Sequence, residues 1–431
     1  MASSVIRSLG VAVESSVGSV PTGSNFPDAS ALSFVYPDLR RGSLTTVGEQ
    51  AVVEQDNARS GPYRHPAEPV VTHDDSGNPQ RLRMGSVTLT LPVRTIGPGD
   101  LVFTDYTTLG LHRLLASGFA VYTPAAATVG ITASGGETEI VAGDADDLTV
   151  GQLLKLESNS QGIPDYSGLV HKVDATETLT LSPAFGAVPS FADDTLRQMV
   201  TYYIGLGYGA PLGNTVALVL DGDGWRSYLV GGRWTTARFY VEQRQLMVDL
   251  TVEGSIYDDH DNAEVTDPTE APGDIAHLLS ARSCISSSAI PADATGYGLS
   301  STTLHLHEFE LTVTNTLSRL GSGLTALGYN QVEIADVLVE GSITLSAPVG
   351  SYDDVQLNRE HRQVMIGFGP GGKGQGAAIY LPAAIFTADG SLRDTDGDTV
   401  RQRLQMQQGR CRNDTSSNGP GNSHFRLGLT L

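Results

Sequence analysis

Two stretches of the chain have nearly the same sequence, and both alternate apolar and hydroxyl residues. Residues 85–93 read GSVTLTLPV and residues 341–349 read GSITLSAPV, with six of the nine positions identical. The alternation has the period of two that is typical of a β-strand with one buried face. In the first stretch the two faces are Val87, Leu89 and Leu91 against Ser86, Thr88 and Thr90. A chain built on such strands must fold into sheets that cover one face.

A short helix is predicted after each of these strands. In TDYTTLGLHRLLASG the candidate N-cap is Thr104 or Asp105 and the helix ends at Gly118, with an apolar face of Leu111, Leu114 and Leu115. In DDVQLNREHRQVMIG, residues 353–367, Asp353 or Asp354 is the candidate cap of a second helix. The shared order of strand, helix and further strands predicts two related β domains.

A third similar stretch leaves the register of this duplication open. Residues 249–256 read DLTVEGSI and residues 336–343 read DVLVEGSI. This match aligns the two halves differently from the first one. Coincidence is the alternative, because Val, Thr, Ser and Gly are common in β-strands and short alternating segments recur widely.

Strand patterns fill most of the remaining chain, so we predict a mainly β protein. Its 431 residues suggest two or three domains. Residues 123–199 contain short strands at turn spacing and predict a small inserted β-barrel or sandwich. Residues 1–122 and 200–265 form the first predicted β-sandwich domain, with an N-terminal arm, and residues 266–431 form the second.

Charge and cysteine content exclude some functions. Lys and Arg total 27 against 48 Asp and Glu, a formal charge of −21, which disfavours tight binding to nucleic acid or to anionic membranes. The two cysteines, Cys284 and Cys411, form no disulfide framework and suit a reducing cytosol, although one bridge between them is possible. No segment approaches the length of a signal peptide core or a membrane span, so we expect a soluble protein.

Two glycine- or aspartate-rich stretches resemble ligand-binding loops but suit turns better. Residues 367–374, GFGPGGKG, match a phosphate-binding loop except that Gly374 replaces the Ser or Thr that holds magnesium. The predicted context, a helix before and a strand after, is also reversed, so we expect a hairpin tip. Asp394, Asp396 and Asp398 are spaced like the start of a calcium loop, but Gln405 stands where its Glu belongs, which favours an Asp-Gly turn.

Histidine and aspartate clusters give no catalytic set either. His305 and His307 could present two imidazoles from one face of a strand, but without a third ligand we expect a polar stripe facing solvent. Residues 258–261, DDHD, are interpreted as a solvated loop. We therefore predict no catalytic, cofactor-binding or metal-binding residues and no enzyme activity.

Several segments together resemble the tail tube proteins of long-tailed bacteriophages. The opening GVAVESSVGSVPTG, with Glu14 and Gly18, is similar to the N-terminal segment of that family. GSVTLTLPV with the helix ending LLASGF looks like its core strand and helix. The run ALVLDGDGWRSYLVGGRWTTARFYVEQRQLMVDLTVEG resembles its strand, Asp-Gly turn, Gly-Gly turn and β-hairpin, and FELTVTNTLSRLG with ADVLVEGSITLSAPV resembles a second hairpin. These segments cover about two thirds of the chain.

The resemblance implies a structural virion protein with two tail-tube-like β-sandwich domains. Subunits of the family form rings that stack into a hollow tube for DNA, and a duplicated fold implies three chains per pseudo-hexameric ring. Partners are then copies of the chain and other tail proteins at the tube ends, with DNA only in transit, no membrane and no cofactor. Assembly takes place in the host cytoplasm and the product is the virion tail. The inserted module and the absence of a second N-terminal arm depart from the family pattern. The alternative is a receptor- or carbohydrate-binding protein of the tail tip or another surface.

Overall fold

The structure is a computed structural model, and it describes the following parts of the chain. The described residues are 3–14, 32–50, 52–53, 68–69, 71–73, 79–81, 83–95, 109–124, 128–134, 139–142, 148–157, 166–173, 178–182, 195–204, 214–222, 225–259, 274–276, 278, 283–287, 289, 301–321, 329–346, 358–369, 376–387, 393–396, 399–408 and 419–430.

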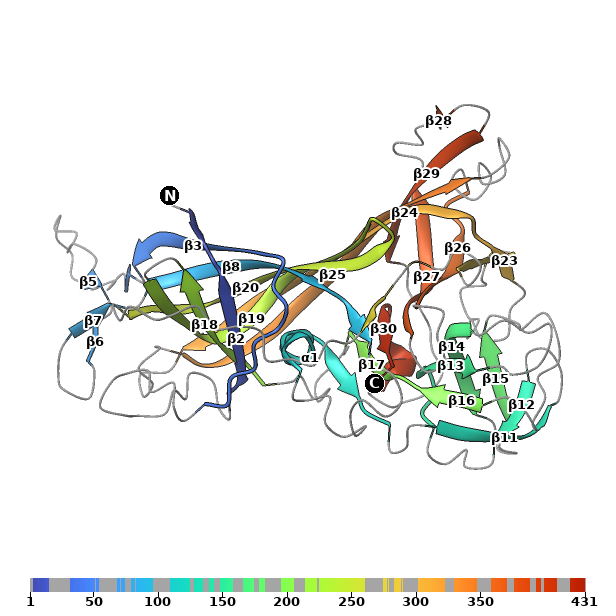
Figure 1. The fold of residues 1–431 in the computed structure, drawn as a ribbon, viewed down its shortest axis with the longest axis horizontal. Helices are drawn as coiled ribbons and strands as arrows, with labels where there is room; N and C mark the ends of the chain where they lie inside the picture. The colour runs from blue at the N-terminus through green and yellow to red at the C-terminus, as the bar shows by residue number, and fades with distance from the viewer. Residues whose placement is uncertain are drawn as a thin grey trace, which may run out of the picture.

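The fold is mainly β, as predicted, and one large antiparallel sheet dominates it (Figure 1). Its strands are β1 (Ser3–Val5), β2 (Ser8–Val13), β3 (Arg41–Gln50), β8 (Arg83–Pro92), β10 (Ala120–Tyr122), β17 (Val200–Tyr203), β18 (Val216–Gly222), β19 (Trp225–Glu242), β20 (Gln245–Asp259), β22 (Cys284–Ser286), β23 (Ser301–Thr303), β24 (Leu306–Gly321), β25 (Tyr329–Ser346), β26 (His361–Phe368), β27 (Ala377–Thr387), β28 (Arg393–Asp396), β29 (Thr399–Gln408) and β30 (Arg426–Leu429).

The remaining described elements are short. A six-stranded closed barrel consists of β11 (Thr128–Ser134), β12 (Glu139–Ala142), β13 (Leu153–Glu157), β14 (Tyr166–Val173), β15 (Thr178–Ser182) and β16 (Thr195–Gln198). Three two-stranded pairs are β9 (Arg94–Thr95) with β21 (Asp274–Ile275), β4 (Val52–Val53) with β5 (Glu68–Pro69), and β6 (Val71–His73) with β7 (Pro79–Arg81). The helices are α1 (Gly110–Ala116) and the 3₁₀ turn η5 (Pro420–Asn422).

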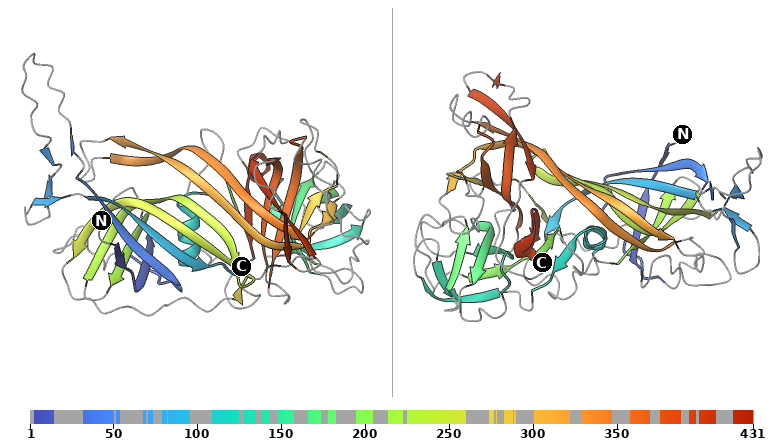
Figure 2. Two further views of the ribbon diagram at one scale, coloured as in Figure 1. Left: turned by 90° about the horizontal axis from the view of Figure 1, so that it is seen from above. Right: turned by 180° about the vertical axis from the view of Figure 1, so that it is seen from behind.

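Two long hairpins form the centre of the large sheet. Strands β19 and β20 make one hairpin and β24 and β25 the other, and β19 pairs antiparallel with β24. The strand order is therefore β20, β19, β24, β25, with β8 beyond β20 and β29 beyond β25. Figure 2 shows the orange pair β24–β25 running alongside the yellow-green strands. Four strands of this length give the molecule a broad, curved wall.

The two hairpins are related by an approximate twofold axis. Thr236 on β19 lies opposite Thr314 on β24, and on either side of this pair each hairpin continues to its outer strand. DLTVEGSI lies in the outer strand β20 and DVLVEGSI in the outer strand β25, so these two stretches occupy equivalent places. In both, the glycine packs against a leucine of the inner strand: Gly254 against Leu229, and Gly341 against Leu311.

The repeat of residues 85–93 and 341–349 does not mark equivalent positions. GSVTLTLPV lies in β8, the neighbour of β20, whereas GSITLS lies in β25 itself. The place beside β25 that corresponds to β8 is taken by β29, whose sequence TVRQRLQMQQ is different. The match between 249–256 and 336–343 therefore gives the register that the fold supports.

Helix α1 forms where it was predicted but begins later. Its N-cap is Leu109, which makes no side-chain cap, while Thr104 and Asp105 lie outside the described residues. The predicted apolar face is confirmed, because all three of its leucines are buried: Leu111, Leu114 and Leu115. Among the described residues, no helix has the length and apolar character needed to cross a membrane.

The second predicted helix is wrong over its C-terminal half. Residues 361–368 form strand β26, which pairs with β27 and β22, and residues 351–357 lie outside the described part of the chain. Val364, Ile366 and Phe368 are all buried in this strand. The β-branched residues fit a sheet that is covered on both faces, and this tertiary pairing overrides the helix predicted from the candidate N-cap.

The closed barrel lies at one end of the molecule, beside β26 and β27 (Figure 1). Its strand β13 buries three leucines, Leu153, Leu154 and Leu156, and pairs with both β14 and β16. Arg197 donates to Glu157 across the β13–β16 pair at 2.8 Å. The Leu153 N–H donates to the Thr201 hydroxyl on β17 at 3.1 Å, and Gly428 of β30 packs against the Leu153 side chain. The barrel is therefore fastened to the large sheet.

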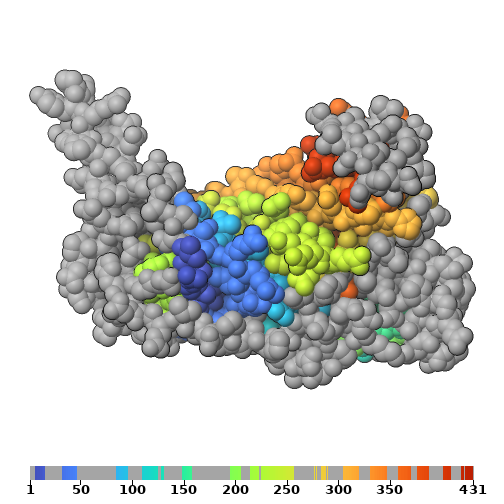
Figure 3. All heavy atoms as spheres, turned by 45° about the horizontal axis from the view of Figure 1, so that its top comes forward, coloured from blue at the N-terminus to red at the C-terminus, as the bar shows by residue number. Residues whose placement is uncertain are grey.

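The two predicted β-sandwich domains share one sheet and one core. Besides the β19–β24 pair, strand β30 pairs with β17 from the first half and with β27 from the second. One hydrophobic cluster contains buried residues of both halves. Figure 3 shows the same continuity on one surface, where blue, yellow-green and orange atoms adjoin. The described strands thus form a joined structure, in which a separate sandwich for each half is not distinguished.

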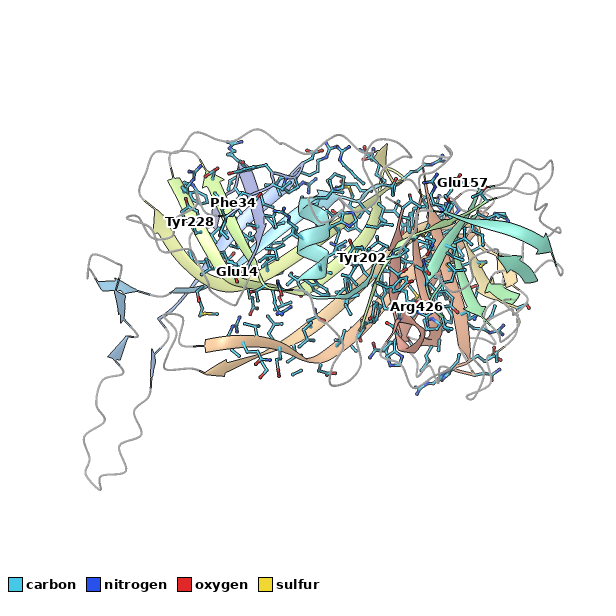
Figure 4. The ribbon with its side chains drawn as sticks, turned by 90° about the horizontal axis from the view of Figure 1, so that it is seen from below. Glu14, Phe34, Glu157, Tyr202, Tyr228 and Arg426 are labelled. Atoms are coloured by element: carbon cyan, nitrogen blue, oxygen red, sulfur yellow. The ribbon has the colours of Figure 1, made fainter. Side chains whose placement is uncertain are left out.

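An aromatic cluster lies beneath this junction. Phe119, which follows α1, contacts Trp234 of β19 and stacks on Phe425 next to β30, with ring centroids 4.7 and 5.3 Å away. His112 of α1 bonds to the hydroxyl of Tyr202, which is labelled in Figure 4. Burial lowers the pKa of His112 to about 3, so this imidazole stays neutral at physiological pH. The cluster fixes the helix against strands of both halves.

Replacing Gly118 by alanine should destabilise this cluster. A Cβ atom at Gly118 would lie 2.1 Å from Cε2 of the fully buried Trp234, so the ring must shift. We expect Gly118→Ala to lower the free energy of unfolding by about 2–3 kcal/mol in urea titrations. Gly130→Ala is the control, because no atom lies within 4 Å of a Cβ there, and it should stay within about 0.5 kcal/mol of wild type. Equal effects of both substitutions would contradict the packing described here.

Candidate functional site

The central sheet has one apolar face and one polar face across six strands. We define the polar face by the following side chains: Ser86, Thr88, Thr90, Thr236, Arg238, Tyr240, Asp249, Thr251, Glu253, Glu310, Thr312, Thr314, Glu340, Ser342, Arg403, Gln405 and Gln407. Except for Ser342, each of these residues is half-buried or exposed. The opposite face of the same strands is buried, for example Leu89, Leu250, Phe239, Leu311, Ile343 and Leu404.

Strand register sets the polar side chains in rows that cross both hairpins. One row runs from β8 to β29 through directly opposed residues: Thr90, Asp249, Arg238, Thr312, Glu340 and Gln407. The next row runs through Thr88, Thr251, Thr236 and Thr314. Opposed residues in an antiparallel sheet point to the same side, so these rows form one continuous surface.

Arg238 is the centre of the hydrogen-bond network on the polar face. Its Nε donates to Glu310 at 2.8 Å, and its guanidinium lies 3.5 Å from the Asp249 carboxylate. The guanidinium also stacks over the ring of Tyr240, 4.9 Å from the centroid. Asp249 accepts hydrogen bonds from the Thr90 hydroxyl at 2.7 Å and from the Tyr240 hydroxyl at 3.3 Å. One cation thus links three neighbouring strands.

These contacts change the acidity of three groups. The hydrogen bond from Arg238 lowers the pKa of Glu310 below its ordinary value of 4.5, and the same bond raises the pKa of Arg238. Burial, followed by the charge of Asp249, raises the pKa of Tyr240. All three groups therefore keep their ordinary charge states at neutral pH.

Hydroxyl groups are the commonest chemistry on the polar face. Nine of its 17 side chains are Ser, Thr or Tyr, while four carboxylates and two guanidinium groups give it a formal charge of −2. Neighbouring groups bond to each other, as when Arg403 donates to Ser342 at 3.1 Å. These 17 side chains therefore carry a weak net negative charge, and several of their charges are paired within the face.

A buried pair of charged residues, Glu14 and Arg233, holds the N-terminal strand and both hairpins together. The carboxylate of Glu14, which is labelled in Figure 4, accepts from the Thr215 hydroxyl at 2.5 Å and from the N–H of Gly231 at 2.8 Å. Arg233 donates to the carbonyl of Ser117 at 2.6 Å and to that of Val332 on β25 at 2.9 Å. Burial lowers the pKa of Arg233 to about 10, and the charge of Glu14 opposes this shift.

Gly231 allows this arrangement because its φ angle is +63°, in the region that favours glycine. The sequence predicted a Gly-Gly turn here, but β19 continues through Gly231 and Gly232. A β-bulge between Val230 and Arg233 takes the place of the turn. Bulges redirect side chains, and this one lies between the N–H that contacts Glu14 and the buried Arg233.

The end of hairpin β24–β25, here called the ribbon tip, comprises residues 316–321 and 329–338. In this segment β24 and β25 pair with each other, and β19 and β29 pair with them only farther from the tip, at 310–314 and 340–346. Side-chain bonds such as Arg319 to Glu253, at 3.3 Å, link it to the sheet. Leu338, 45 % exposed, lies on the outer strand β25 opposite Thr314, so its side chain is on the same side of the sheet as the polar face. Among the described strands, none extends the ladder on either side of the ribbon tip.

The two glycine- and aspartate-rich stretches occur at hairpins. GFGPGGKG joins β26 to β27, where Phe368 lies opposite Ala377, so it follows a strand rather than the predicted helix; residues 370–375 are outside the described part. The hairpin prediction is confirmed there. DTDGD joins β28 to β29, with Asp396 opposite Thr399, which confirms the turn between strands; residues 397 and 398 are not described.

The other histidine, aspartate and cysteine candidates lie in separate parts of the described chain or outside it. The loop predicted at 258–261 is wrong for Asp258 and Asp259, because they extend β20 and pair with β19. Residues 260 and 261 lie outside the described part, as does Cys411. Cys284 lies in β22. His305 and His307 are exposed, as predicted for a polar stripe. Within the described stretches, no three His, Cys, Asp or Glu side chains gather as around a metal ion.

Sequence reasoning found the strands of this face but missed its network. The alternation of Thr236, Arg238 and Tyr240 was the available signal, since it places all three on one side of β19. Their partners Glu310 and Asp249 belong to other strands, and only the register reveals them. No protein-family model matches the chain, and no curated protein is recognisably similar to it in sequence.

The pKa of Glu310 predicts how its ion pair responds to acid. Because the pKa is lowered in the folded protein, the stabilisation is complete above 4.5 and is lost as the pH falls through the folded-state pKa. We expect Glu310→Gln to destabilise by a few tenths of a kcal/mol to about 1 kcal/mol at pH 7 and by less at pH 3, measured by denaturant unfolding. Arg238→Gln should show the same pH trend. An effect that grows toward low pH would contradict this assignment.

Removing the charge of Arg233 should lower the free energy of unfolding much more than removing the charge of Glu310. Arg233→Met leaves two carbonyl bonds unmade and Glu14 buried without its counter-charge, so we expect a loss of about 3 kcal/mol or more in unfolding free energy. Arg238→Met, on the same strand but with a side chain 43 % exposed, is the control and should cost about 1 kcal/mol or less. The order of the two effects, read from urea midpoints, tests the role of the buried pair.

Proposed function

We propose that this protein is a structural subunit of the tail tube of a long-tailed bacteriophage, which assembles with its own copies into stacked hollow rings. The observation that carries the proposal is the two-sided central sheet. Six neighbouring strands bury most of one face and present continuous polar rows on the other. A broad sheet with a polar face toward solvent and a buried apolar face suits the lining of a conduit.

The chemistry of the polar face is suited to contact with DNA in transit. Its hydroxyl groups and internally paired charges offer no array of free cations, so phosphates would meet a weakly repulsive surface and would not be retained. The overall charge of −21 acts in the same direction. Low affinity is what a passage requires, because the polymer must move through it.

The ends of the sheet support assembly with copies of the same chain. An unextended edge such as the ribbon tip can add strands from a neighbouring molecule, and the exposed Leu338 lies beside it. The two equivalent hairpins in one chain mean that three chains supply six hairpins, so we propose a trimeric, pseudo-hexameric ring. The closed barrel then projects from the outside of the tube.

The closed barrel also favours a second candidate, a receptor- or carbohydrate-binding protein of the tail tip. Small closed β-barrels are common binding modules, and this one is a distinct unit at the end of the molecule (Figure 1). The two candidates differ in their assembly. A tube subunit polymerises, whereas a tip protein stays a discrete particle that binds bacterial surface sugars.

Electron microscopy of the purified protein tests the proposal. We expect negative-stain images to show rings or hollow tubes, and sedimentation to show species that grow with concentration. Discrete monomers or trimers at every concentration, together with binding to surface sugars, would overturn it in favour of the tip protein.

A charge at the ribbon tip should block this assembly without unfolding the chain. Leu338→Lys removes exposed apolar surface and places a cation at the edge, so we expect the melting temperature to stay within a few degrees of wild type while rings and tubes disappear. Thr88→Lys is the control, since Thr88 lies on the polar face away from the ribbon tip and is also exposed. Assembly by Leu338→Lys at the wild-type concentration would refute a role for this edge.

A further inference from the structure

A pocket of about 410 Å³ lies where the turn of one central hairpin meets the base of the other. Four segments that are far apart in sequence contribute to it. Among the described residues it is lined by Arg244, Leu278, His305, Leu306, His307 and Ser346. A volume of this size is within the range of small-molecule sites in proteins, about 300–1,000 Å³.

Backbone hydrogen bonds hold these segments in place. The N–H of Leu278 donates to the carbonyl of Arg244 at 2.8 Å, and the N–H of Ser346 donates to the carbonyl of His305 at 2.9 Å. The side chains of His307 and Ser346 are also hydrogen-bonded to each other. The backbone of these segments is therefore held in place by the fold, and the side chains of His307 and Ser346 are oriented toward each other.

A β-bulge lies beside the pocket. The register of the β24–β25 pair shifts between Leu306 and Glu308, which leaves His307 as the extra residue. Leu306 is buried while His305 and His307 are exposed. His305 and His307 are two residues apart and point to the same side, and bulges often occur beside functional sites.

The combination of side chains favours an anion over a metal ion. Arg244 supplies a permanent positive charge, which repels cations and can donate two parallel hydrogen bonds to an oxyanion. The imidazoles and the Ser346 hydroxyl can donate further bonds. The neighbouring carboxylate, Glu308, does not line the pocket and accepts a hydrogen bond from Thr344 at 3.1 Å.

We propose that this pocket is a binding site for a small phosphate monoester. Arg244, His305, His307 and Ser346 bind the phosphate oxygens, and the apolar wall of Leu278 and Leu306 packs against the organic part. The volume exceeds that of a phosphate ion and leaves room for a body of the size of a pentose. The site is independent of the proposed tube function, since one chain contains all of the residues named.

The hairpin turn makes a clean test possible. Gln243 and Arg244 have φ angles of +52° and +67°, which asparagine tolerates better than either residue. Arg244→Asn therefore removes the pocket cation while suiting the turn, and Gln243→Asn, which alters the same turn outside the pocket lining, is the matched control. Both variants should fold as well as the wild type.

The experiment is calorimetric titration of the full chain with ribose 5-phosphate, inorganic phosphate and ribose. We expect ribose 5-phosphate to bind more tightly than phosphate, and ribose not to bind. Arg244→Asn should weaken ribose 5-phosphate binding by at least about tenfold, and Gln243→Asn should leave it unchanged. A second variant, His305→Gln with His307→Gln, should also weaken ribose 5-phosphate binding. It tests the site independently if Arg244→Asn folds poorly.

Three results would overturn the proposal. The first is no binding of either phosphate compound to the wild type at millimolar concentration. The second is binding that both variants leave intact, which places the ligand elsewhere. The third is tight binding of zinc alone that the histidine variant abolishes and phosphate does not affect, which would make the pocket a cation site.

Discussion

The antiparallel pairing of β19 with β24 is the constraint on which the described structure depends. It joins two hairpins, one from each half of the chain, into a sheet whose alternation continues without interruption from β8 to β29. The pairing is direct only from Thr236 to Tyr240 on β19, opposite Thr314 to Glu310 on β24. Around this short ladder the buried Arg233 and Trp234 tie the strands to the helix and to β25, so packing and hydrogen bonds fix the same register.

The polar and apolar faces of this sheet are stabilised in different ways. The apolar face gains from removal of large side chains from water and depends on close fit, as the contact of Gly118 with Trp234 illustrates. The polar face stays in contact with water, so its ion pairs contribute little to stability and mainly define a surface. That difference explains why Arg233 and Arg238, five residues apart on β19, have such different environments.

The strands could be predicted from sequence because the alternation of apolar and polar residues lies within each strand, as between Val87 and Leu91. The core leucines of α1 could be predicted for the same reason. The helix predicted at 353–367 is wrong from residue 361 onward, because Val364 and Met365 pair with β22, a strand that is distant in sequence. Register was the hardest part: the sequence contains two matches that align the halves differently, 85–93 with 341–349 and 249–256 with 336–343, and only the strand pairing decides between them. The network of Arg238 and the pocket beside Arg244 depend on contacts between distant strands, which no local pattern encodes.

The pairing of β30 with two other strands has a consequence for how the protein reaches its fold. Val200 of β17 lies opposite Leu429, and Ala377 of β27 lies opposite the same residue on the other side. Contacts between residues so distant in sequence form slowly, because the entropy cost of closing a long loop comes before the contacts can stabilise the fold. Until β30 arrives, β17 and β27 expose edges that can pair with any other extended chain. Folding of this protein is thus in a kinetic competition with premature association, and conditions that slow intermolecular encounters should raise the yield of correctly folded subunits.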